Sequence, residues 1–382
     1  MSKVKLGIIG IGNMGSGHIK NILADKCPQI ELVAVADINP ARLEWAKETI
    51  PEVARFDNAE AMLDSGLLDA CLVAVPHYDH PRYAMECFER GIHVMVEKPA
   101  GVYTKKVREM NEMAKNCNVV FGMMFNQRTN PMYIKMRELL QSGELGELRR
   151  TNWVITDWYR SQFYYDSGDW RATWSGEGGG VLLNQCPHQL DLWQWICGMP
   201  VKVDVKMHFG KWHDIEVEDD VTAYVEYANG ATGLFVTTTG DFPGSNRFEV
   251  TCEKGRMLAE GKTLKVLRLK TGLNEFKAET PFDKPEYEEE VFEYADRGNQ
   301  HVGILNAFAK RILEGTDLIA GGEEGINGLT LSNAMHLSAF LGKEIELPLD
   351  EDLYYEELMK RVKTSRKKDA TQAVVGDTTG TY

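Results

Sequence analysis

One histidine in the chain stands among polar residues that suit proton transfer. His188 lies in the segment LLNQCPHQLDLWQW (182–195), with Asn184 four residues before it and Asp191 three residues after it. Helical geometry would bring residues at these offsets onto neighbouring faces. The segment allows an acid/base site, a metal site, or a helix start with Asn184 as N-cap and Pro187 at the third helical position. A metal site is disfavoured, because no third ligand stands at a sensible spacing.

A lysine is the second group that could do chemistry. The segment VMVEKPAG (94–101) places Glu97, Lys98 and Pro99 at the carboxyl end of a predicted strand. In doubly wound sheets, ligands bind outside these strand ends. A residue before proline is held extended, so the Lys98 ammonium can project into the cleft. A surface lysine is the alternative interpretation.

A glycine-rich loop near the amino terminus predicts a dinucleotide site. The segment GIIGIGNMGSGH (7–18) runs from a predicted strand into a predicted helix. Its spacing, with glycines at three positions, suits the close approach of backbone N–H groups to a pyrophosphate. The loop residues expected to contact the cofactor are Gly10, Ile11, Gly12, Asn13, Met14 and Gly15.

Asp37 favours NAD as that dinucleotide. It ends the next predicted strand, 22 residues after Gly15, where it can accept hydrogen bonds from ribose hydroxyls. Its carboxylate should repel a 2′-phosphate, so NADP is disfavoured. Arg42 lies nearby and could soften that preference.

Alternating strands and helices must position these groups in the first 125 residues. Strands are predicted at 3–9, 31–37, 70–75, 93–97 and 119–123, and helices at 14–26, 40–48, 81–89 and 105–115. Apolar runs such as LVAVAD and ACLVAV are typical of parallel strands covered on both faces. Residues 1–125 are therefore predicted to form a Rossmann NAD-binding domain of the α/β class.

The pattern changes after residue 125. A helix is predicted at 131–141, and alternating runs between about 200 and 293 predict antiparallel strands, with a hairpin at Asn229-Gly230. Two more helices are predicted near 300–314 and 324–341. We expect residues 126–364 to form an α+β domain with a large, mostly antiparallel open sheet, and residues 365–382 to form a flexible polar tail.

Composition excludes several classes of protein. The net charge is −14, which argues against nucleic acid as a partner, because phosphate binding needs clustered cations. No run approaches the roughly 18 apolar residues of a membrane span. The strand pattern begins almost at residue 1, which leaves no room for a signal peptide. The seven cysteines lack CxxC spacing, so we expect no zinc cluster and a cytoplasmic protein with reduced thiols.

Together these motifs give a resemblance that covers the chain to about residue 364. The glycine loop, VPHYDH (75–80), EKPAG (97–101), GGG (178–180) with a histidine eight residues later, HVGILNAFAKRI (301–312) and ELPLD (346–350) occur in one chain. This set resembles the Gfo/Idh/MocA family, named after glucose–fructose oxidoreductase, inositol dehydrogenase and rhizopine catabolism.

The resemblance implies hydride exchange between a nicotinamide and a secondary alcohol of a sugar or cyclitol. It implies that Lys98 is the active-site lysine and that His188 is the acid/base candidate. It also implies that the open sheet serves oligomerisation, as a homodimer or homotetramer. Further residues expected beside the cofactor are Val75, Pro76, His77, His80 and Glu97.

The two candidate groups suit this chemistry. A base must take the hydroxyl proton, which suits His188, and a cation must stabilise the developing alkoxide, which suits Lys98. The family usually has aspartate where this chain has Asn184. Asparagine cannot supply a charge, but its amide can bind the histidine or a substrate hydroxyl, so it is a candidate substrate contact as well as a helix cap. Asp191 is expected on the helix face, where it could brace His188.

Aromatic and basic residues before the GGG turn are candidates for binding a sugar, whose rings stack on aromatic faces. Ordinary packing is the alternative for each of them. The candidates are Arg171 and Trp174, then Tyr159 and Arg160, and Arg128 after the last Rossmann strand.

Two other functions stay open. One is an NAD-dependent glycosidase that uses transient oxidation, as some relatives do. The other is a nucleotide-binding sensor without catalysis, which would have no need of both Lys98 and His188.

Overall fold

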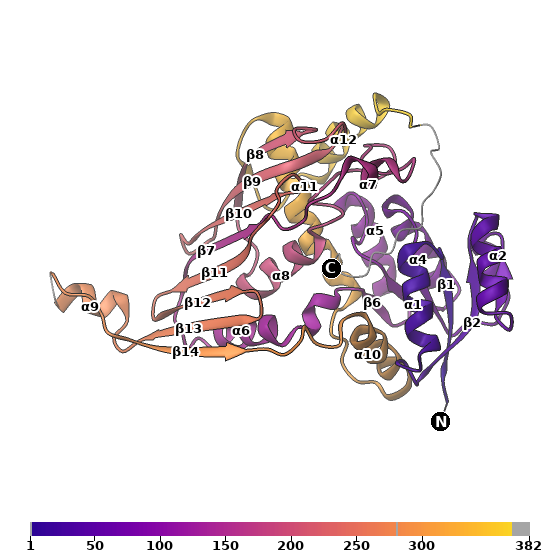
Figure 1. Cartoon of the computed structure of the whole chain (residues 1–382), viewed down its shortest axis with the longest axis horizontal. Helices are drawn as coiled ribbons and strands as arrows, with labels where there is room; N and C mark the ends of the chain where they lie inside the picture. The colour runs from indigo at the N-terminus through magenta and orange to yellow at the C-terminus, as the bar shows by residue number, and fades with distance from the viewer. Residues whose placement is uncertain (1, 280–281, 369–382) are drawn as a thin grey trace.

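The computed structural model describes residues 2–279 and 282–368. The molecule has two lobes, each built on one β-sheet (Figure 1). The amino terminus lies in the lobe on the right of the figure, and the larger sheet runs across the left. This arrangement confirms the predicted fold class.

Six parallel strands form the sheet of the first lobe, in the order β3-β2-β1-β4-β5-β6. This is the order of a Rossmann sheet. The strands are β1 (Val4–Ile9), β2 (Ile30–Ala36), β3 (Ala54–Phe56), β4 (Ala70–Val73), β5 (His93–Val96) and β6 (Phe121–Met123). Ile8 is paired with Val35 on one side and with Leu72 on the other, so β1 lies at the centre of the sheet.

Helices connect these strands as a parallel sheet requires. They are α1 (Asn13–Leu23), α2 (Pro40–Thr49), α3 (Ala59–Leu63), α4 (His80–Glu89) and α5 (Thr104–Lys115), with the 3₁₀ turn η1 (His77–Asp79) before α4. Side chains cap two of them, because Asn39 accepts the N–H of Ala41 and Asn58 accepts that of Ala61.

One helix of this lobe comes from much later in the chain. Helix α10 (Gln300–Glu314) places Ile304, Leu305 and Phe308 in the same apolar cluster as Leu6 and Ile8 of β1. The dinucleotide-binding lobe therefore consists of the first 125 residues and this returning helix.

The second sheet has nine strands in the order β14-β13-β12-β11-β7-β10-β9-β8-β15. All neighbouring strands are antiparallel except β7 and β10, which run parallel. The strands are β7 (Leu148–Ile155), β8 (Lys202–Phe209), β9 (Glu218–Glu226), β10 (Thr232–Thr238), β11 (Asn246–Cys252), β12 (Gly255–Glu260), β13 (Thr263–Leu269), β14 (Tyr287–Glu293) and β15 (Ile345–Glu346).

Helices cover one face of this sheet (Figure 1). Trp153 of β7 stacks on Phe248 of β11 at 4.2 Å and Phe235 of β10 on Trp193 of α8 at 5.3 Å, which makes this face a dry aromatic layer. The helices of the second lobe are α6 (Pro131–Gln141), α7 (Gln162–Asp166), α8 (Pro187–Cys197), α9 (Leu273–Glu279), α11 (Gly325–Leu341) and α12 (Glu351–Lys363), with the 3₁₀ turns η2 (Asn126–Thr129) and η3 (Gly322–Glu324).

Several predictions about local structure can be compared with the observed helices, strands and turns. The Asn229-Gly230 hairpin joins β9 to β10, with Gly230 at φ +83° and the N–H of Ala231 donated to the Asn229 side chain. The predicted helix at 131–141 is α6. The short strand β3 and the central strand β7 were not among the predicted strands.

The helix that carries His188 begins later than expected. Its N-cap is Cys186 and Pro187 is its first residue, so the prediction that Asn184 caps the helix is wrong. A proline at the first helical position has no N–H to leave unpaired and its φ suits the helix, so Pro187 defines the start.

The first residues of the expected polar tail have contacts. Residues 365–368 reach back to the second lobe, where Ser365 donates to Glu216, Arg366 is paired with Asp214, and Lys368 donates to the carbonyl of Tyr165. Residues 369–382 lie outside the described part of the chain. Within the described part, no helix combines the length and hydropathy of a membrane span.

Candidate active site

Glycines shape the loop between β1 and α1. Gly10 has φ +86°, and a Cβ there would lie 2.5 Å from the carbonyl oxygen of Ala74. A Cβ on Gly15 would lie 2.0 Å from the carbonyl oxygen of Gly10, whereas the position of a Cβ on Gly12 is open. The loop is therefore packed at its two ends and leaves room at Gly12, the N-cap of α1, where a pyrophosphate would meet backbone N–H groups.

Asp37 follows β2 and contacts this loop. One carboxylate oxygen accepts the N–H of Ile11 at 2.8 Å and the other accepts that of Asn39 at 2.8 Å. Each oxygen has a second lone pair for a ribose hydroxyl. Arg42 donates its Nε to the carbonyl of Ile11, so a cation also lies close to the expected ribose position.

Glu97 is buried at the end of β5 and is paired with a histidine of α1. Its Oε1 lies 2.6 Å from Nε2 of His18, and its Oε2 accepts the N–H of Lys98. Burial alone would raise the pKa of Glu97, but the hydrogen bond and charge of His18, with His301 and Lys98, lower it to about 2. Glu97 therefore stays ionised and joins the glycine-loop helix to the turn that carries Lys98.

Lys98 is half-buried between the two lobes. Its peptide bond to Pro99 is cis, and its Nζ donates to the backbone carbonyl of Asn184 at 3.1 Å. Burial lowers the pKa of Lys98, Glu97 and Glu177 raise it, and Arg160 lowers it further, for a net decrease. These charges show that Lys98 lies among residues from both lobes.

His188 lies in the first turn of α8, with 3% of its surface exposed. Neither ring nitrogen has a hydrogen-bond partner among the described residues, although both are buried. Burial lowers the pKa of His188 well below its usual value, and the charges of Lys98 and His301 lower it further. The imidazole is therefore neutral near pH 7 and able to accept a proton.

Asn184 lies between these groups, in the loop before α8. Its backbone carbonyl receives the Lys98 ammonium, and its side-chain Nδ2 donates to Oε1 of Glu177. Glu177 is 2% exposed, and its other oxygen accepts the N–H of Ala172 at 2.6 Å. The buried carboxylate of Glu177 thus contacts the side chain of Asn184.

The histidines of the VPHYDH segment have different surroundings. The ring nitrogens of His80 lie 2.6 Å from the carbonyl oxygen of Pro99 and 2.7 Å from that of Val75, so His80 holds two loops together and does not line an open cleft. His77 packs against Trp170 at 5.8 Å, and its Nδ1 has no partner within the described ranges. Burial lowers the pKa of His77, and the charges of His80 and Lys98 lower it further. His77 therefore lies near Trp170 and Lys98. Val75 and Pro76 follow β4, beside Gly10.

An aromatic and basic cluster connects Lys98 to the end of β7. Arg171 donates to the hydroxyl of Tyr164 at 2.9 Å, and its guanidinium lies 4.6 Å from that ring. Arg160 belongs to the same cluster, with its guanidinium 5.1 Å from the centre of the Tyr164 ring and 5.6 Å from that of the Trp158 ring. Tyr159, by contrast, is 47% exposed.

Two predicted substrate contacts are structural. Arg128 is 2% exposed and forms a two-pronged ion pair with Asp191, at 2.7 and 2.8 Å, and a third bond to Glu324. Because the Arg128 side chain is buried and its charge is neutralised by these carboxylates, it is not placed to bind a ligand, and Asp191 binds Arg128 and does not brace His188. Trp174 is 6% exposed and packs edge-on against Phe209 and two other rings, so it belongs to the core.

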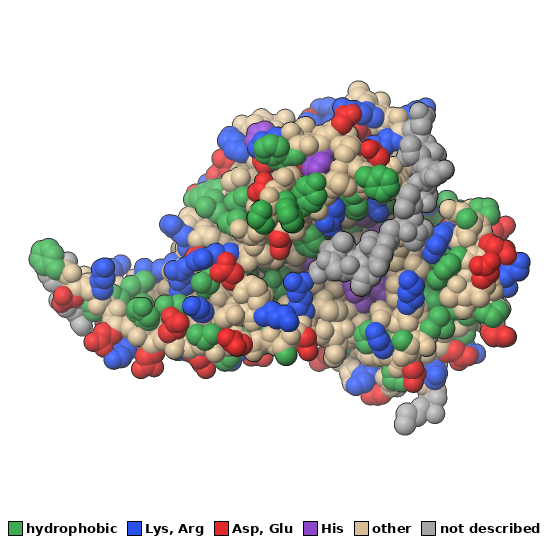
Figure 2. Space-filling view, viewed as in Figure 1, with side chains coloured by type: hydrophobic (Ala, Val, Ile, Leu, Met, Phe, Trp, Pro, Cys, Tyr) green, Lys and Arg blue, Asp and Glu red, His purple; other side chains and the backbone are tan. Residues whose placement is uncertain are grey.

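Figure 2 shows the molecule hollowed between the lobes, with basic side chains and histidines around the hollow. A polar cavity of about 270 Å³, partly open to solvent, is lined by Trp158, Arg160 and Gln189, together with Asp157 and Arg297. Three lining atoms, Trp158 Nε1, Arg160 Nε and Gln189 Oε1, are buried without a partner among the described residues. Such atoms suit the hydroxyls of a ligand.

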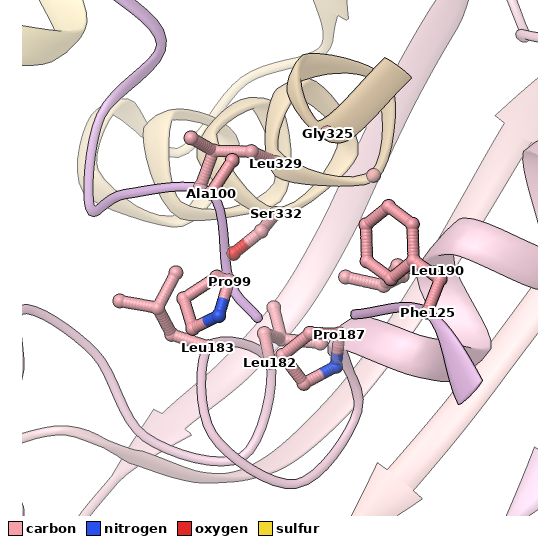
Figure 3. A pocket seen from close by; sticks show the side chains of 11 residues that line it. Pro99, Ala100, Phe125, Leu182, Leu183, Pro187, Leu190, Gly325, Leu329 and Ser332 are labelled. Atoms are coloured by element: carbon pink, nitrogen blue, oxygen red, sulfur yellow. The ribbon is translucent and has the colours of Figure 1, made fainter. Parts of the chain in front are cut away.

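A small apolar space lies behind the candidate catalytic groups (Figure 3). Pro99 and Ala100 face Pro187 and Leu190 across it, with α11 on the far side. A Cβ on Gly325 of α11 would lie 2.8 Å from Cβ of Ala100. Close packing on α11 therefore holds the turn of Lys98 and the start of α8 in one position. The site has no described group of three or more His, Cys, Asp or Glu that could hold a metal.

Sequence reasoning missed Glu177, Tyr164 and His18. The sequence did point to Glu177, because it is the sole charged residue in the glycine-rich run GEGGG, where a closely packed turn is expected. His18 and Tyr164 meet their partners only through the tertiary fold.

Comparisons with known proteins agree with this geometry. Residues 4–125 match the model of an oxidoreductase family with an NAD-binding Rossmann fold, and residues 133–258 match that of the GFO/IDH/MocA C-terminal domain. The chain is 27% identical to the rhizopine catabolism protein MocA of Rhizobium meliloti over 52% of this chain, a match that spans 58% of that protein.

Two further relatives match over more of the length. The D-glucoside 3-dehydrogenase of Escherichia coli is 25% identical over 91% of this chain and 98% of that protein. The structure of the WlbA dehydrogenase from Bordetella pertussis, in complex with NADH and UDP-GlcNAcA, superposes with a TM-score of 0.76 at 26% identity, covering 91% of this chain and 100% of that one. The chain belongs to the Gfo/Idh/MocA oxidoreductase family, and its amino-terminal domain is an NAD-binding Rossmann domain.

Proposed function

We propose that the protein is an NAD-dependent dehydrogenase that oxidises a secondary alcohol of a sugar, glycoside or cyclitol. The observation that carries this proposal is the pairing of two groups from different lobes. His188 is buried and neutral with both ring nitrogens unpartnered within the described chain, and Lys98 acts on it as a nearby positive charge. A base and a cation at one place are what removal of a hydroxyl proton requires.

The two groups divide the work at the carbinol. When bound, the nicotinamide supplies the hydride acceptor. His188 takes the hydroxyl proton, and the Lys98 ammonium stabilises the negative charge that develops on the same oxygen. The bond from Lys98 Nζ to the Asn184 carbonyl holds the ammonium in position.

The rest of the substrate would occupy the polar cavity. The cavity has Trp158 for stacking and unpartnered polar atoms on Arg160 and Gln189. Tyr164 contacts both Arg160 of the cavity lining and Arg171, whose charge acts on Lys98, so Arg171 and Tyr164 would contact the ring that is oxidised. The D-glucoside 3-dehydrogenase relative supports a glycoside as one member of the substrate class.

The test is NADH formation with a panel of inositols, hexoses, anhydrosugars and glycosides. We expect oxidation of at least one compound, with kcat reduced about 10²–10³-fold in Lys98→Met, as for loss of an oxyanion-stabilising group. Binding of NADH, followed by its fluorescence, should persist in that variant. Full activity of Lys98→Met would refute the assignment of Lys98.

Two other results would replace the proposed reaction. Sugar released from a glycoside without net NADH would indicate a glycosidase that uses transient oxidation. NADH binding with no product from any compound, in either direction, would indicate a sensor.

We also propose that the chain forms a homodimer or homotetramer through the uncovered face of its larger sheet. Val154, Tyr224 and Leu234 are 37–41% exposed on neighbouring strands of that face. Apolar side chains in a row on an uncovered sheet favour association with a second sheet. Light scattering should give a multiple of the chain mass, and a charged residue at Leu234 should lower it.

A further inference from the structure

Glu177 is a buried acid in a turn shaped for it. It lies between Gly176 and Gly178, and neither glycine tolerates a side chain. A Cβ on Gly176 would lie 2.5 Å from the carbonyl oxygen of Trp170, and one on Gly178, at φ +82°, would lie 2.2 Å from Val102. These close contacts restrict the conformation of the turn, and the Glu177 side chain is buried, with 2% of its surface exposed.

The contacts of Glu177 determine which way the Asn184 amide faces. One carboxylate oxygen accepts from the Ala172 N–H, and the other accepts from Nδ2 of Asn184. An ionised carboxylate only accepts hydrogen bonds, so the amide must turn its NH₂ group toward Glu177 and its oxygen away. No described residue donates to the Asn184 oxygen, while its backbone carbonyl binds Lys98.

We propose that Glu177 and Asn184 together do the work of one active-site carboxylate, with Asn184 Oδ1 accepting a substrate hydroxyl and Glu177, as a positioning residue, orienting that amide and supplying the negative charge behind it. This inference rests on the proposed dehydrogenase function. It explains how an asparagine can stand beside Lys98 and His188 where the resemblance leads one to expect aspartate.

The charges around the pair fit this division. Arg171 and Lys98 are positive charges near Glu177, and Glu218 is a second acid near it. Burial raises the pKa of Glu177, Arg171 and the two hydrogen bonds lower it, and Glu218 raises it, for a net increase. Two carboxylates in direct contact at this place would repel each other, and an amide in front of the acid avoids that repulsion.

The experiment exchanges the two groups. Glu177→Gln leaves the Asn184 amide without a fixed orientation, and Asn184→Asp puts two carboxylates in contact. Each single variant should lower kcat about 10²-fold, as misplacement at a reacting centre does. In the double variant Glu177→Gln/Asn184→Asp, the new amide donates to the new carboxylate, so kcat should return to within about tenfold of wild type and show strong coupling in the cycle.

A matched control uses Glu218, a buried acid at the start of β9 that binds the same loop. Glu218 accepts the N–H groups of Gly180 and Leu182 but does not bond Asn184. Glu218→Gln should therefore fail to restore the activity of Asn184→Asp. Additive losses in the Glu177 double variant, an equal rescue by Glu218→Gln, or single variants with wild-type kcat would each overturn the inference.

Thermal melting keeps this test separate from the proposed reaction. If wild type oxidises no compound of the panel, the dehydrogenase proposal fails. The pairing is still tested, because Asn184→Asp should lower the Tm and Glu177→Gln should restore it, whereas Glu218→Gln should not. A Tm of Asn184→Asp equal to that of wild type would contradict the pairing.

Discussion

The ion pair between Arg128 and Asp191 gives a prediction that separates a structural role from a substrate contact. Both side chains are 1% exposed and joined by two bonds, and Glu324 of η3 adds a third. The Arg128 guanidinium lies between the rings of Phe125 and Trp195, at 5.3 and 5.2 Å. Methionine is chosen as the replacement in Arg128→Met because it keeps an apolar stem beside these rings. The variant removes the charge and leaves Asp191 buried with Gln194 as its remaining donor.

The size of the effect follows from that uncompensated charge. Breaking a buried pair by removing one partner costs about 3–5 kcal/mol. Glu324 is 38% exposed and can turn to water, so the loss comes mainly from Asp191. The unfolding entropy of about 2.1 cal/mol/K per residue converts a loss of this size into a Tm lower by about 4–6 °C for a chain of 382 residues. In Arg128→Met burial should raise the pKa of Asp191 further, so protonation at lower pH relieves the charge and the Tm difference shrinks as the pH falls.

The assay combines thermal melting between pH 5 and pH 8 with steady-state kinetics at 20 °C. We expect a lower Tm, a difference that narrows toward pH 5, and a KM for the best substrate of the panel within about twofold of wild type. Asp191→Leu in the same background should recover part of the lost Tm, because it removes the unpaired carboxylate. An unchanged Tm together with a large rise in KM would refute the structural role and restore Arg128 as a substrate contact.

Three further predictions concern the cofactor loop and the reacting groups. The pKa of His188 is lowered well below 6.5 and that of Lys98 is lowered below 10.5. The value of kcat/KM should therefore fall on the acid side only well under pH 6.5, and on the alkaline side before pH 10.5. A fall on the acid side at or above pH 6.5 would contradict the role of His188. Wild type should prefer NAD over NADP in kcat/KM, and Asp37→Ser should narrow that preference while raising the KM for NAD; equal use of both cofactors by wild type would sink the assignment of Asp37. Gly15→Ala should weaken NADH binding measured by fluorescence titration, because its Cβ would lie 2.0 Å from a loop carbonyl, whereas Gly17→Ala, with open space around it, should bind as wild type does.

Local patterns predicted the parts of the fold that depend on local physics. The glycine loop, the runs of apolar residues and the helix at 131–141 each follow from spacing, capping or turn chemistry. The start of α8 was misjudged because Asn184 is a good cap in isolation, whereas here its side chain bonds Glu177 and leaves that role to the residue before Pro187.

The residues of the candidate site were likewise predicted only where local sequence patterns carry the information. Lys98 and His188 belong to short motifs that can be recognised in the sequence, but residues that meet only through the tertiary fold cannot be read from spacing. Arg128 and Asp191 are 63 positions apart, and nothing near either one shows that they neutralise each other. Trp174 looks like a sugar platform in the sequence and becomes core only once Phe209 and α11 pack around it.

The return of α10 to the Rossmann sheet has a consequence for how the protein is made. The strands of that sheet leave the ribosome about 180 residues before α10 does, which at 5–20 residues per second is a delay of about 10–35 s. During that time the apolar cluster that contains Leu6 and Ile8 of β1 lacks the side chains that α10 contributes to it. The cofactor domain therefore cannot mature before most of the second domain has been synthesised, and a fragment that ends at residue 125 would expose a surface suited to chaperones and to aggregation.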